Sequence, residues 1–291
     1  MPTYDTPQPI SVSVELGVGD LTIQAGDRSD TAVEVRPSDP DRKADVAAAE
    51  QTRVEYSAGR LLVRAPKGWK EYSPWGGNGS VTVTIELPTG SDVQTDTGVT
   101  ALRVTGRLGR LDHKAGVGEV WLDETGPLHL KTGAGDVTVT RAVGEVQVST
   151  GTGSIHLGAV DGTAVVKNSN GDTWIDSVTG DTRVNAANGR ITVGRAHGSV
   201  SARSANGDIT LSEVRSGSIH ATTAAGRVDV GVLDGVAAWL DLDTKFGAIR
   251  SGLDATERPS SNEGTVEVRA RSSFGDVTVH RTYGDAAKDA S

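Results

Sequence analysis

Apolar and polar residues alternate along most of this chain, and a glycine interrupts the alternation about every nine residues. The second and fourth residues after a glycine are apolar, as in Val137 and Val139 or Ile209 and Leu211, and the residue between them is polar or variable. A period of two predicts short strands with one buried face. The glycines are Gly118, Gly126, Gly135, Gly144, Gly153, Gly162, Gly171, Gly180, Gly189, Gly198, Gly207, Gly217, Gly226 and Gly235.

Two kinds of corner alternate between these strands. One kind is apolar, as in "RAV" and "SEV", and the other is small or amide, as in "AANG" and "SANG". The repeat therefore has about 18 residues and contains two strands. A single repeat cannot bury its own apolar face, so the pattern predicts stacked coils with two parallel sheets. We predict an all-β, single-stranded parallel β-helix, or β-solenoid, with right-handed coils.

The corner residues have backbone roles in this interpretation. Glycine tolerates a positive φ and a close approach of another chain segment. Asparagines at one corner of successive coils would lie about 4.8 Å apart and form an amide ladder. The predicted structural corners are Gly171, Gly180, Gly189, Gly198, Gly207, Asn170, Asn188 and Asn206.

Thr173 and Thr182 break the apolar pattern, because both occupy the slot that is apolar in the other repeats from Gly118 to Gly226. A buried hydroxyl without a partner costs about 1–3 kcal/mol. We therefore expect the two hydroxyls to bond each other or nearby carbonyls.

The two ends of the chain differ from the regular repeat and predict caps, because a solenoid must cover its terminal sheet edges. We expect a β-rich cap over residues 1–108, regular coils over 109–247, and C-terminal coils, a cap and a mobile tail over 248–291. The stretch "ISVSVELGVGDLTIQAG" predicts two strands with a glycine turn, and "DRKADVAAAEQTRV" predicts a helix over residues 41–52.

Composition excludes several functions. The chain has no cysteine, which excludes disulfides, thiolate catalysis and thiolate metal sites. A net charge of −9 and no visible basic patch argue against nucleic acid. Every apolar stretch is shorter than the roughly 18 residues that a membrane span needs. The start lacks a basic region followed by an apolar run, so we expect no signal peptide and a cytoplasmic location, with export by another route left open.

Candidate catalytic and metal-binding residues are few. Asp follows the glycine at Asp136, Asp172, Asp181 and Asp208, but the paired glycines of a calcium-binding β-roll are missing. We expect no metal and no cofactor. His129, His156 and His220 occupy separated outward slots. A polysaccharide-acting β-helix enzyme would need clustered carboxylates, and one sheet offers Glu119, Asp123, Asp136, Asp172 and Asp176.

Aromatic residues make up only 4% of the chain, so their placement is informative. Trp69, Tyr72 and Trp75 lie together in the Pro/Gly-rich loop 66–79 and suit sugar stacking, a protein partner or a cover over the first coil. Trp121 and Trp174 fall in outward slots of one predicted sheet, where they could line a binding stripe or be covered by the N-terminal segment.

The chain resembles a family of bacterial putative adhesins with β-strand repeats. The resemblance rests on "ISVSVELGVGDLTIQAG", "KAGVGEVWL", "KTGAGDVTV", the "ANGDITL" units, "TKFGAIR" and "SSFGDVTV". It covers nearly the whole chain and implies a β-solenoid. It implies no catalytic residues.

Together these features predict a non-enzymatic scaffold or binding protein that presents long strand faces for protein or assembly contacts. Strand addition at an imperfectly capped end is one route to assembly. The alternatives are a carbohydrate-binding surface adhesin that uses the loop 66–79, and a polysaccharide-acting enzyme.

Overall fold

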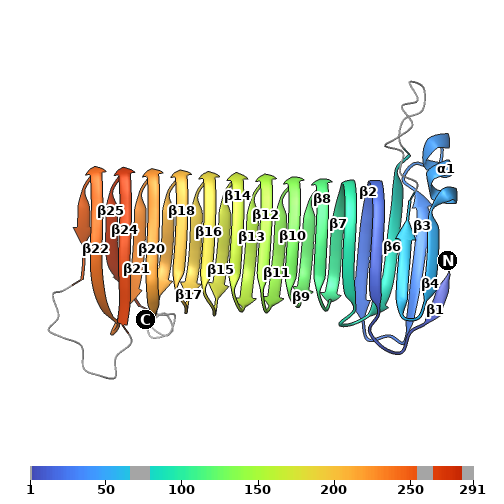
Figure 1. Cartoon of the computed structure of the whole chain (residues 1–291), viewed down its shortest axis with the longest axis horizontal. Helices are drawn as coiled ribbons and strands as arrows, with labels where there is room; N and C mark the ends of the chain where they lie inside the picture. Colours follow the sequence, from blue (N-terminus) through green and yellow to red (C-terminus); the bar gives the residue numbers. More distant parts are fainter. Residues whose placement is uncertain (1, 66–78, 254–264, 284–291) are drawn as a thin grey trace, which may run out of the picture. The chain divides into compact units, whose positions relative to one another are not determined.

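The computed structural model describes residues 2–65, 79–253 and 265–283, and the chain divides into two units. Residues 1–143 and 148–150 form unit 1, and residues 144–147 and 151–291 form unit 2. The described residues are nearly all β, as the period of two predicts (Figure 1). Parallel strands dominate both units, as the stacking of repeats predicts. The predicted β-solenoid is confirmed. The predicted division at residues 108 and 247 stays a prediction.

Unit 1 begins with the N-terminal elements and continues into parallel coils. Its elements are β1 (Thr3–Asp5), β2 (Ser11–Gly26), β3 (Asp30–Pro37), α1 (Lys43–Gln51), β4 (Arg53–Ser57), β5 (Arg60–Arg64), β6 (Val81–Pro88), β7 (Asp92–Arg107), β8 (Leu111–Val117), β9 (Val120–Thr125), β10 (Leu128–Ala134) and β11 (Val137–Val143). The strand β12 (Val146–Thr152) has residues in both units. The helix α1 lies within the range that the sequence predicts.

The two strands expected across residues 10–26 are one strand of 16 residues, β2. Its first half pairs with β5, its second half pairs with β6, and both halves pair with β7. The partner changes at Gly19, which has a φ of 147°. A Cβ added there would clash with the carbonyl oxygen of Val81. The expected change of direction at the glycines therefore lies inside one continuous strand, and β7 divides in the same way between β8 and β9.

Antiparallel pairing distinguishes the N-terminal elements from the coils. The strand β3 pairs antiparallel with β6 and with β1, and β4 pairs antiparallel with β5. Asp45 of α1 is buried and accepts backbone N–H bonds from Asp39 and from Ser80, which precedes β6. The helix is therefore tied to the start of a cap strand.

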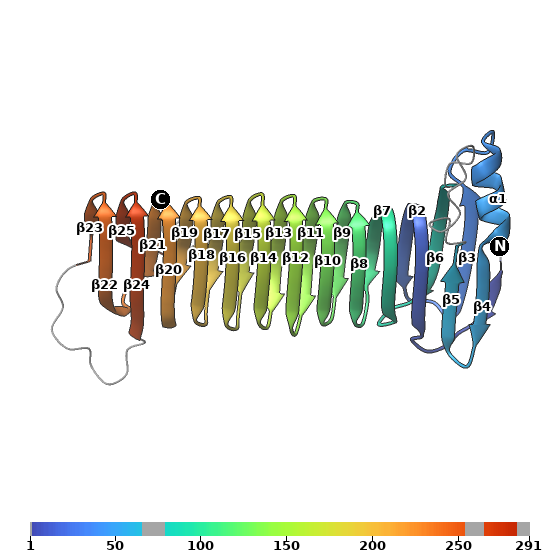
Figure 2. The same cartoon turned by 45° about the horizontal axis from the view of Figure 1, so that its top comes forward.

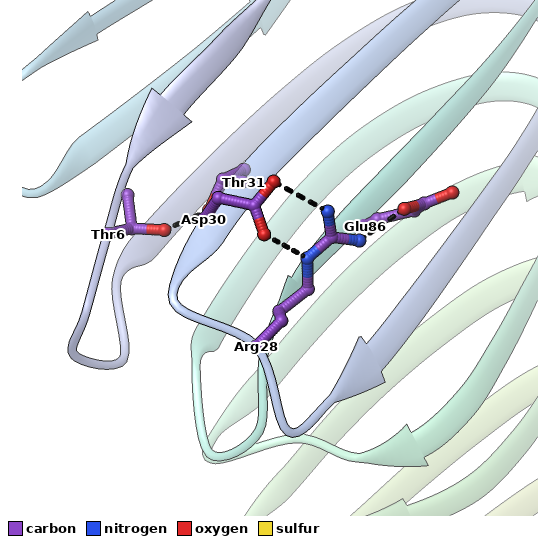
Figure 3. Close-up of polar contacts among 5 residues, drawn as sticks. All are labelled: Thr6, Arg28, Asp30, Thr31 and Glu86. Carbon is purple, nitrogen blue, oxygen red and sulfur yellow. Dashed lines mark hydrogen bonds and ion pairs between the residues drawn. The ribbon is translucent and has the colours of Figure 1, made fainter.

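A polar cluster joins β3 to β6 (Figure 3). The Arg28 guanidinium donates two bonds to Asp30, both 2.9 Å long, and one to Glu86. The bond from Arg28 lowers the pKa of Asp30, and the two carboxylates raise the pKa of Arg28. Beside them, the hydroxyls of Thr6 and Thr31 are buried and lie 2.8 Å apart. The Arg28 guanidinium thus links the first residue of β3 to β6.

We expect Arg28→Met to destabilise unit 1 by about 1–2 kcal/mol, because two carboxylates lose their donor. Chemical denaturation monitored by circular dichroism measures this change. Arg36→Met is the matched control, because Glu34 is the one ion-pair partner of Arg36 among the described residues and the Arg36 side chain is 69% exposed. Such a pair contributes at most about 1 kcal/mol. Equal losses in the two variants would contradict the role given to Arg28.

Unit 2 consists of coils that stack in two parallel sheets (Figure 2). The even sheet contains β14 (Ala164–Asn170), β16 (Thr182–Asn188), β18 (Val200–Asn206), β20 (Gly217–Ala225), β24 (Thr265–Phe274) and β22 (Ala237–Phe246). The odd sheet contains β13 (Ile155–Asp161), β15 (Thr173–Val178), β17 (Ile191–Ala196), β19 (Ile209–Val214), β21 (Val228–Leu233), β25 (Val277–Thr282) and β23 (Ile249–Ser251).

The register follows the glycine spacing. Val184 pairs with Val166 of the preceding coil and with Ala202 of the following coil. The long glycine step adds one residue to the next coil, and Val200 pairs with Ile219. In unit 1 the short step removes one residue, and Leu111 pairs with Leu128. The inward positions are buried and form the core between the two sheets.

The C-terminal coils do not stack in chain order. The strands β24 and β25 pair on one side with β20 and β21, and on the other side with β22 and β23. The last strands of the chain therefore lie between coils that precede them, and β22 is at the end of the row (Figure 1).

Glycine has two backbone roles at the corners. Gly171, Gly189 and Gly207 have φ values of 134°, 139° and 150°, in the region that favours glycine. Gly180 and Gly198 have no such φ, but a Cβ on either would lie within 3 Å of backbone atoms of the preceding coil. Gly162 and Gly217, at the same corner as Gly180 and Gly198, have φ values of 152° and 87°. Positive φ and close approach therefore occur at both corners.

Thr173 and Thr182 are both buried, so their inward register is as predicted. Thr173 Oγ1 accepts a bond of 3.5 Å from Asn168 Nδ2. Thr182 Oγ1 has no partner within the described residues. The expected bond between the two hydroxyls is therefore wrong, and the partner of Thr173 is a side-chain amide, not a carbonyl. The inward slot of Thr182 lies between Ala164 and Val200, which offer no polar side chain.

Candidate functional site

Three of the predicted binding residues, Trp69, Tyr72 and Trp75, lie outside the described residues. The binding role of their loop remains a prediction. The other two predicted aromatic residues, Trp121 and Trp174, lie in different units.

Trp121 is half-buried on β9, and the Arg103 guanidinium lies 5.2 Å from the centre of its ring. The residue beside it on the next coil is Thr138. An arginine over a tryptophan face contributes about 0.5–1 kcal/mol where the site is exposed. Trp121 therefore has a structural partner on its own sheet.

Trp174 is half-buried on β15, between His156 and Thr192. His156 Nε2 lies 3.0 Å from a carboxylate oxygen of Asp176. The residues that pair with Trp174 on the two neighbouring coils are thus polar. In the described part of unit 2, no second aromatic ring lies beside Trp174 on the odd sheet. The two tryptophans do not form a shared stack within either unit.

The aspartates that follow corner glycines bond the backbone of the neighbouring coil. Asp172, Asp181 and Asp208 accept bonds of 2.8–3.0 Å from the N–H groups of residues 190, 199 and 227. Asp276 accepts a bond of 2.9 Å from Ala248, and this bond, together with Arg250, lowers its pKa. These carboxylates hold successive corners together.

Some of the carboxylates considered for catalysis also accept hydrogen bonds from the backbone of a neighbouring coil. Asp123 Oδ2 accepts a bond of 3.2 Å from the Gly106 N–H. The part of the chain that the structure describes contains no group of three or more His, Asp or Glu side chains placed to hold a metal ion. In the same residues, no helix is long and apolar enough to span a membrane.

The asparagine ladder is present along the even sheet. Asn188 Nδ2 donates to Asn170 Oδ1 at 2.8 Å, and Asn206 Nδ2 donates to Asn188 Oδ1 at 2.9 Å. Each side-chain amide donates a hydrogen bond to the amide oxygen of the preceding coil, so the ladder adds one side-chain bond per coil. It also places a row of exposed amides at the end of β14, β16 and β18.

Sequence reasoning predicted C-terminal coils but missed the exposed apolar residues on β22, β23 and β24. Trp239, Phe246, Ile249 and Phe274 are 57%, 66%, 49% and 60% exposed. The Phe246 and Phe274 rings stack with their centres 4.9 Å apart, and the Arg269 guanidinium lies 5.9 Å from the Trp239 ring. Phe246 and Phe274 are the two phenylalanines of the chain. Both precede a glycine, in "KFG" and "SFG", and this shared position in the repeat was the sequence feature that could have predicted their stacking.

His113 is a second residue that the alternation did not reveal as buried. It is 2% exposed on β8, and its Nδ1 bonds Thr95 Oγ1. Its Nε2 has no partner among the described residues. Burial lowers the pKa of His113 to about 4, so the imidazole is neutral at pH 7.

These observations define a β-solenoid in which the corner residues hold successive coils together. The family model for Toastrack DUF4097 matches residues 9–287, and the chain belongs to this family. No curated protein matches the sequence.

Solved structures are similar at low identity. A putative adhesin from Bacteroides fragilis NCTC 9343 is 13% identical, with 97% of this chain and 95% of that chain covered and a TM-score of 0.40. A putative lipid binding protein from Parabacteroides distasonis ATCC 8503 is 11% identical, with coverage of 97% and 95% and a TM-score of 0.37. A putative cell adhesion protein from Clostridium sporogenes ATCC 15579 is 11% identical, with coverage of 97% and 98% and a TM-score of 0.23.

Proposed function

We propose that this protein is a non-enzymatic scaffold that associates with a second copy of itself through the terminal coil β22–β23. The observation that carries the proposal is the outer edge of β22. This strand pairs with β24 on one side, and no strand of the described residues pairs with its other side. Unpaired N–H and C=O groups on such an edge are a template for another strand.

The inward side chains of β22 supply a driving force. Leu240 and Leu242 are only half-buried, whereas their partners in β24, Val268 and Ala270, are fully buried. Covering the open coil would remove the remaining apolar surface of these leucines from water. Burial of apolar surface contributes about 25 cal/mol per Å².

The sequence of β22 is complementary to itself in one antiparallel register. A two-fold axis at Thr244 places Asp243 of each copy opposite Lys245 of the other, and Leu242 opposite Phe246. Asp243 and Lys245 are exposed and have no ion-pair partner among the described residues. Opposite charges across strands contribute about 0.2–1 kcal/mol per pair, and this register has two such pairs. A two-fold contact of this kind closes after two copies.

Charge exchange tests the register. We expect Asp243→Lys and Lys245→Asp each to raise the dimer dissociation constant about tenfold, because each creates two like-charge pairs. The double variant Asp243→Lys with Lys245→Asp should return it to within about threefold of the original protein. Sedimentation velocity over a range of protein concentrations measures all four constants.

A protein that stays monomeric at every concentration would overturn the proposal. So would a double variant that behaves like the sum of the single variants, because rescue requires the same strand on both sides. Arg250→Asp in β23 is a control for general charge effects, since this exposed residue pairs with Asp276 of its own unit.

A further inference from the structure

We infer that the even sheet of unit 2 carries a binding surface for a linear acidic polysaccharide, formed by Lys167, Arg183 and Arg203. This surface is distinct from the edge of β22, and the inference does not depend on self-association. It rests on the outward side chains of three strands that lie side by side, β14, β16 and β18 (Figure 2).

The register brings the three cations around one residue. Lys167 and Arg203 both pair with Asn185, one from each neighbouring coil, and Arg183 is two residues before Asn185 on the same strand. Strand spacing places the Cα atoms of Lys167 and Arg203 roughly 10 Å apart, with Arg183 about 7 Å along the strand from Asn185. The cations therefore alternate between two columns as the coils advance.

No side chain of the described residues neutralises any of the three cations. Lys167, Arg183 and Arg203 are exposed, and none has an ion pair or a side-chain hydrogen bond within the described residues. The strands β14, β16, β18 and β20 contain no Asp or Glu. In a chain with a net charge of −9, four adjacent strands without a carboxylate form a local positive field.

The rest of the face suits a hydroxyl-rich chain. Asn185, Ser201 and Thr222 occupy outward slots among the cations, and the exposed asparagine ladder ends the same strands. These groups donate and accept hydrogen bonds. The positions directly before the ladder asparagines carry small side chains, at Ser169, Ala187 and Ala205.

The spacing and composition favour a polysaccharide over a nucleic acid. Each of the three coils carries one cation and advances about 4.8 Å along the stack, which is close to the length of one sugar in an extended chain with one carboxylate per sugar. Single-stranded nucleic acids bind through aromatic side chains on which bases stack. The outward slots of β14, β16 and β18 contain no Phe, Tyr or Trp.

Binding to polygalacturonate, which carries one carboxylate per sugar, tests this inference. Its fully methyl-esterified form is the uncharged probe, and a dT20 oligonucleotide is the nucleic-acid probe. Isothermal titration calorimetry at several salt concentrations gives the affinities. We expect polygalacturonate to bind, the ester not to bind, and dT20 to bind at least tenfold more weakly than polygalacturonate.

The triple variant Lys167→Gln, Arg183→Gln, Arg203→Gln should weaken polygalacturonate binding at least tenfold. It should also lower the slope of log K against log salt by roughly 2, since three fewer cations release counterions. The matched control is Arg190→Gln, Arg195→Gln, Arg227→Gln, which removes equal charge from exposed positions outside the even sheet of unit 2. We expect the control to bind within about threefold of the original protein.

Three results would overturn the inference: no binding of polygalacturonate, equal weakening in both triple variants, or tighter binding of dT20. Loss of folding does not confuse the test, because the three side chains are exposed and unpaired within the described part of the chain. Their replacement should leave the denaturation midpoint nearly unchanged.

Discussion

Gly189→Ala should destabilise unit 2 by about 3–5 kcal/mol, because it combines backbone strain with a steric clash. An added Cβ would lie 2.1 Å from the Gly171 carbonyl oxygen, so the backbones of two coils would have to separate. The φ of 139° adds strain for a residue with a Cβ. Strained φ values and overpacking each cost about 1–3 kcal/mol. Denaturant midpoints measured by circular dichroism give the change.

Gly252→Ala is the control, because it lies in the same unit. Its nearest neighbour would be the Val279 carbonyl oxygen at 3.8 Å, which is an ordinary contact. We expect a change within about 0.5 kcal/mol. If Gly189→Ala proved equally mild, the corner could not be as tightly stacked as the structure has it.

Stability should fall by about 3 kcal/mol between pH 6.5 and pH 4 because of His113 alone. The folded protein lowers the pKa of this residue from 6.5 to about 4 through burial. Between these values the unfolded chain binds a proton that the folded chain does not, so acidification favours unfolding. Each pKa unit corresponds to about 1.4 kcal/mol, and the contribution is constant above 6.5 and below 4.

The double variant His113→Leu with Thr95→Val should lack this part of the pH dependence. It removes both partners of the buried hydrogen bond, and so leaves neither of them unpaired. The free energy of unfolding of the variant minus that of the original protein should increase by about 3 kcal/mol between pH 7 and pH 4. The increase arises because only the original protein loses the His113 contribution. His197→Leu, at an exposed position in unit 2, serves as the control. A difference independent of pH would show that the fold does not lower the pKa of His113.

The period of the sequence was sufficient to predict the coil. Strict alternation after each glycine specifies which side chains point inward, and a slip of one residue would reverse them all. This is why the alternation alone places Thr173 and Thr182 inside and aligns the asparagines into a ladder. The coils that are one residue longer or shorter follow from the glycine steps in the same way.

Features that depend on contacts between distant segments could not be predicted. Lys167, Arg183 and Arg203 are widely separated in the sequence, so no basic run marks them. His113 lies within the predicted regular coils, but it precedes Gly118, the first glycine used to assign inward and outward positions. Alternation also carries no information on strand order, so β24 and β25 could not be placed between earlier coils. Hydrogen bonds across the sheet, and not local pattern, decide that order.

The strand order of the C-terminal coils has a consequence for synthesis. Among the described strands, β22 has its pairing partner in β24, which begins at Thr265. As the chain emerges from its N-terminal end, β20 and β21 are complete before the segments that pair with their outer edges exist. The growing end of unit 2 therefore stays open until β24 and β25 have been synthesised. A ribosome that stops before residue 265 would release a product in which two coils, and not one, lack their pairing.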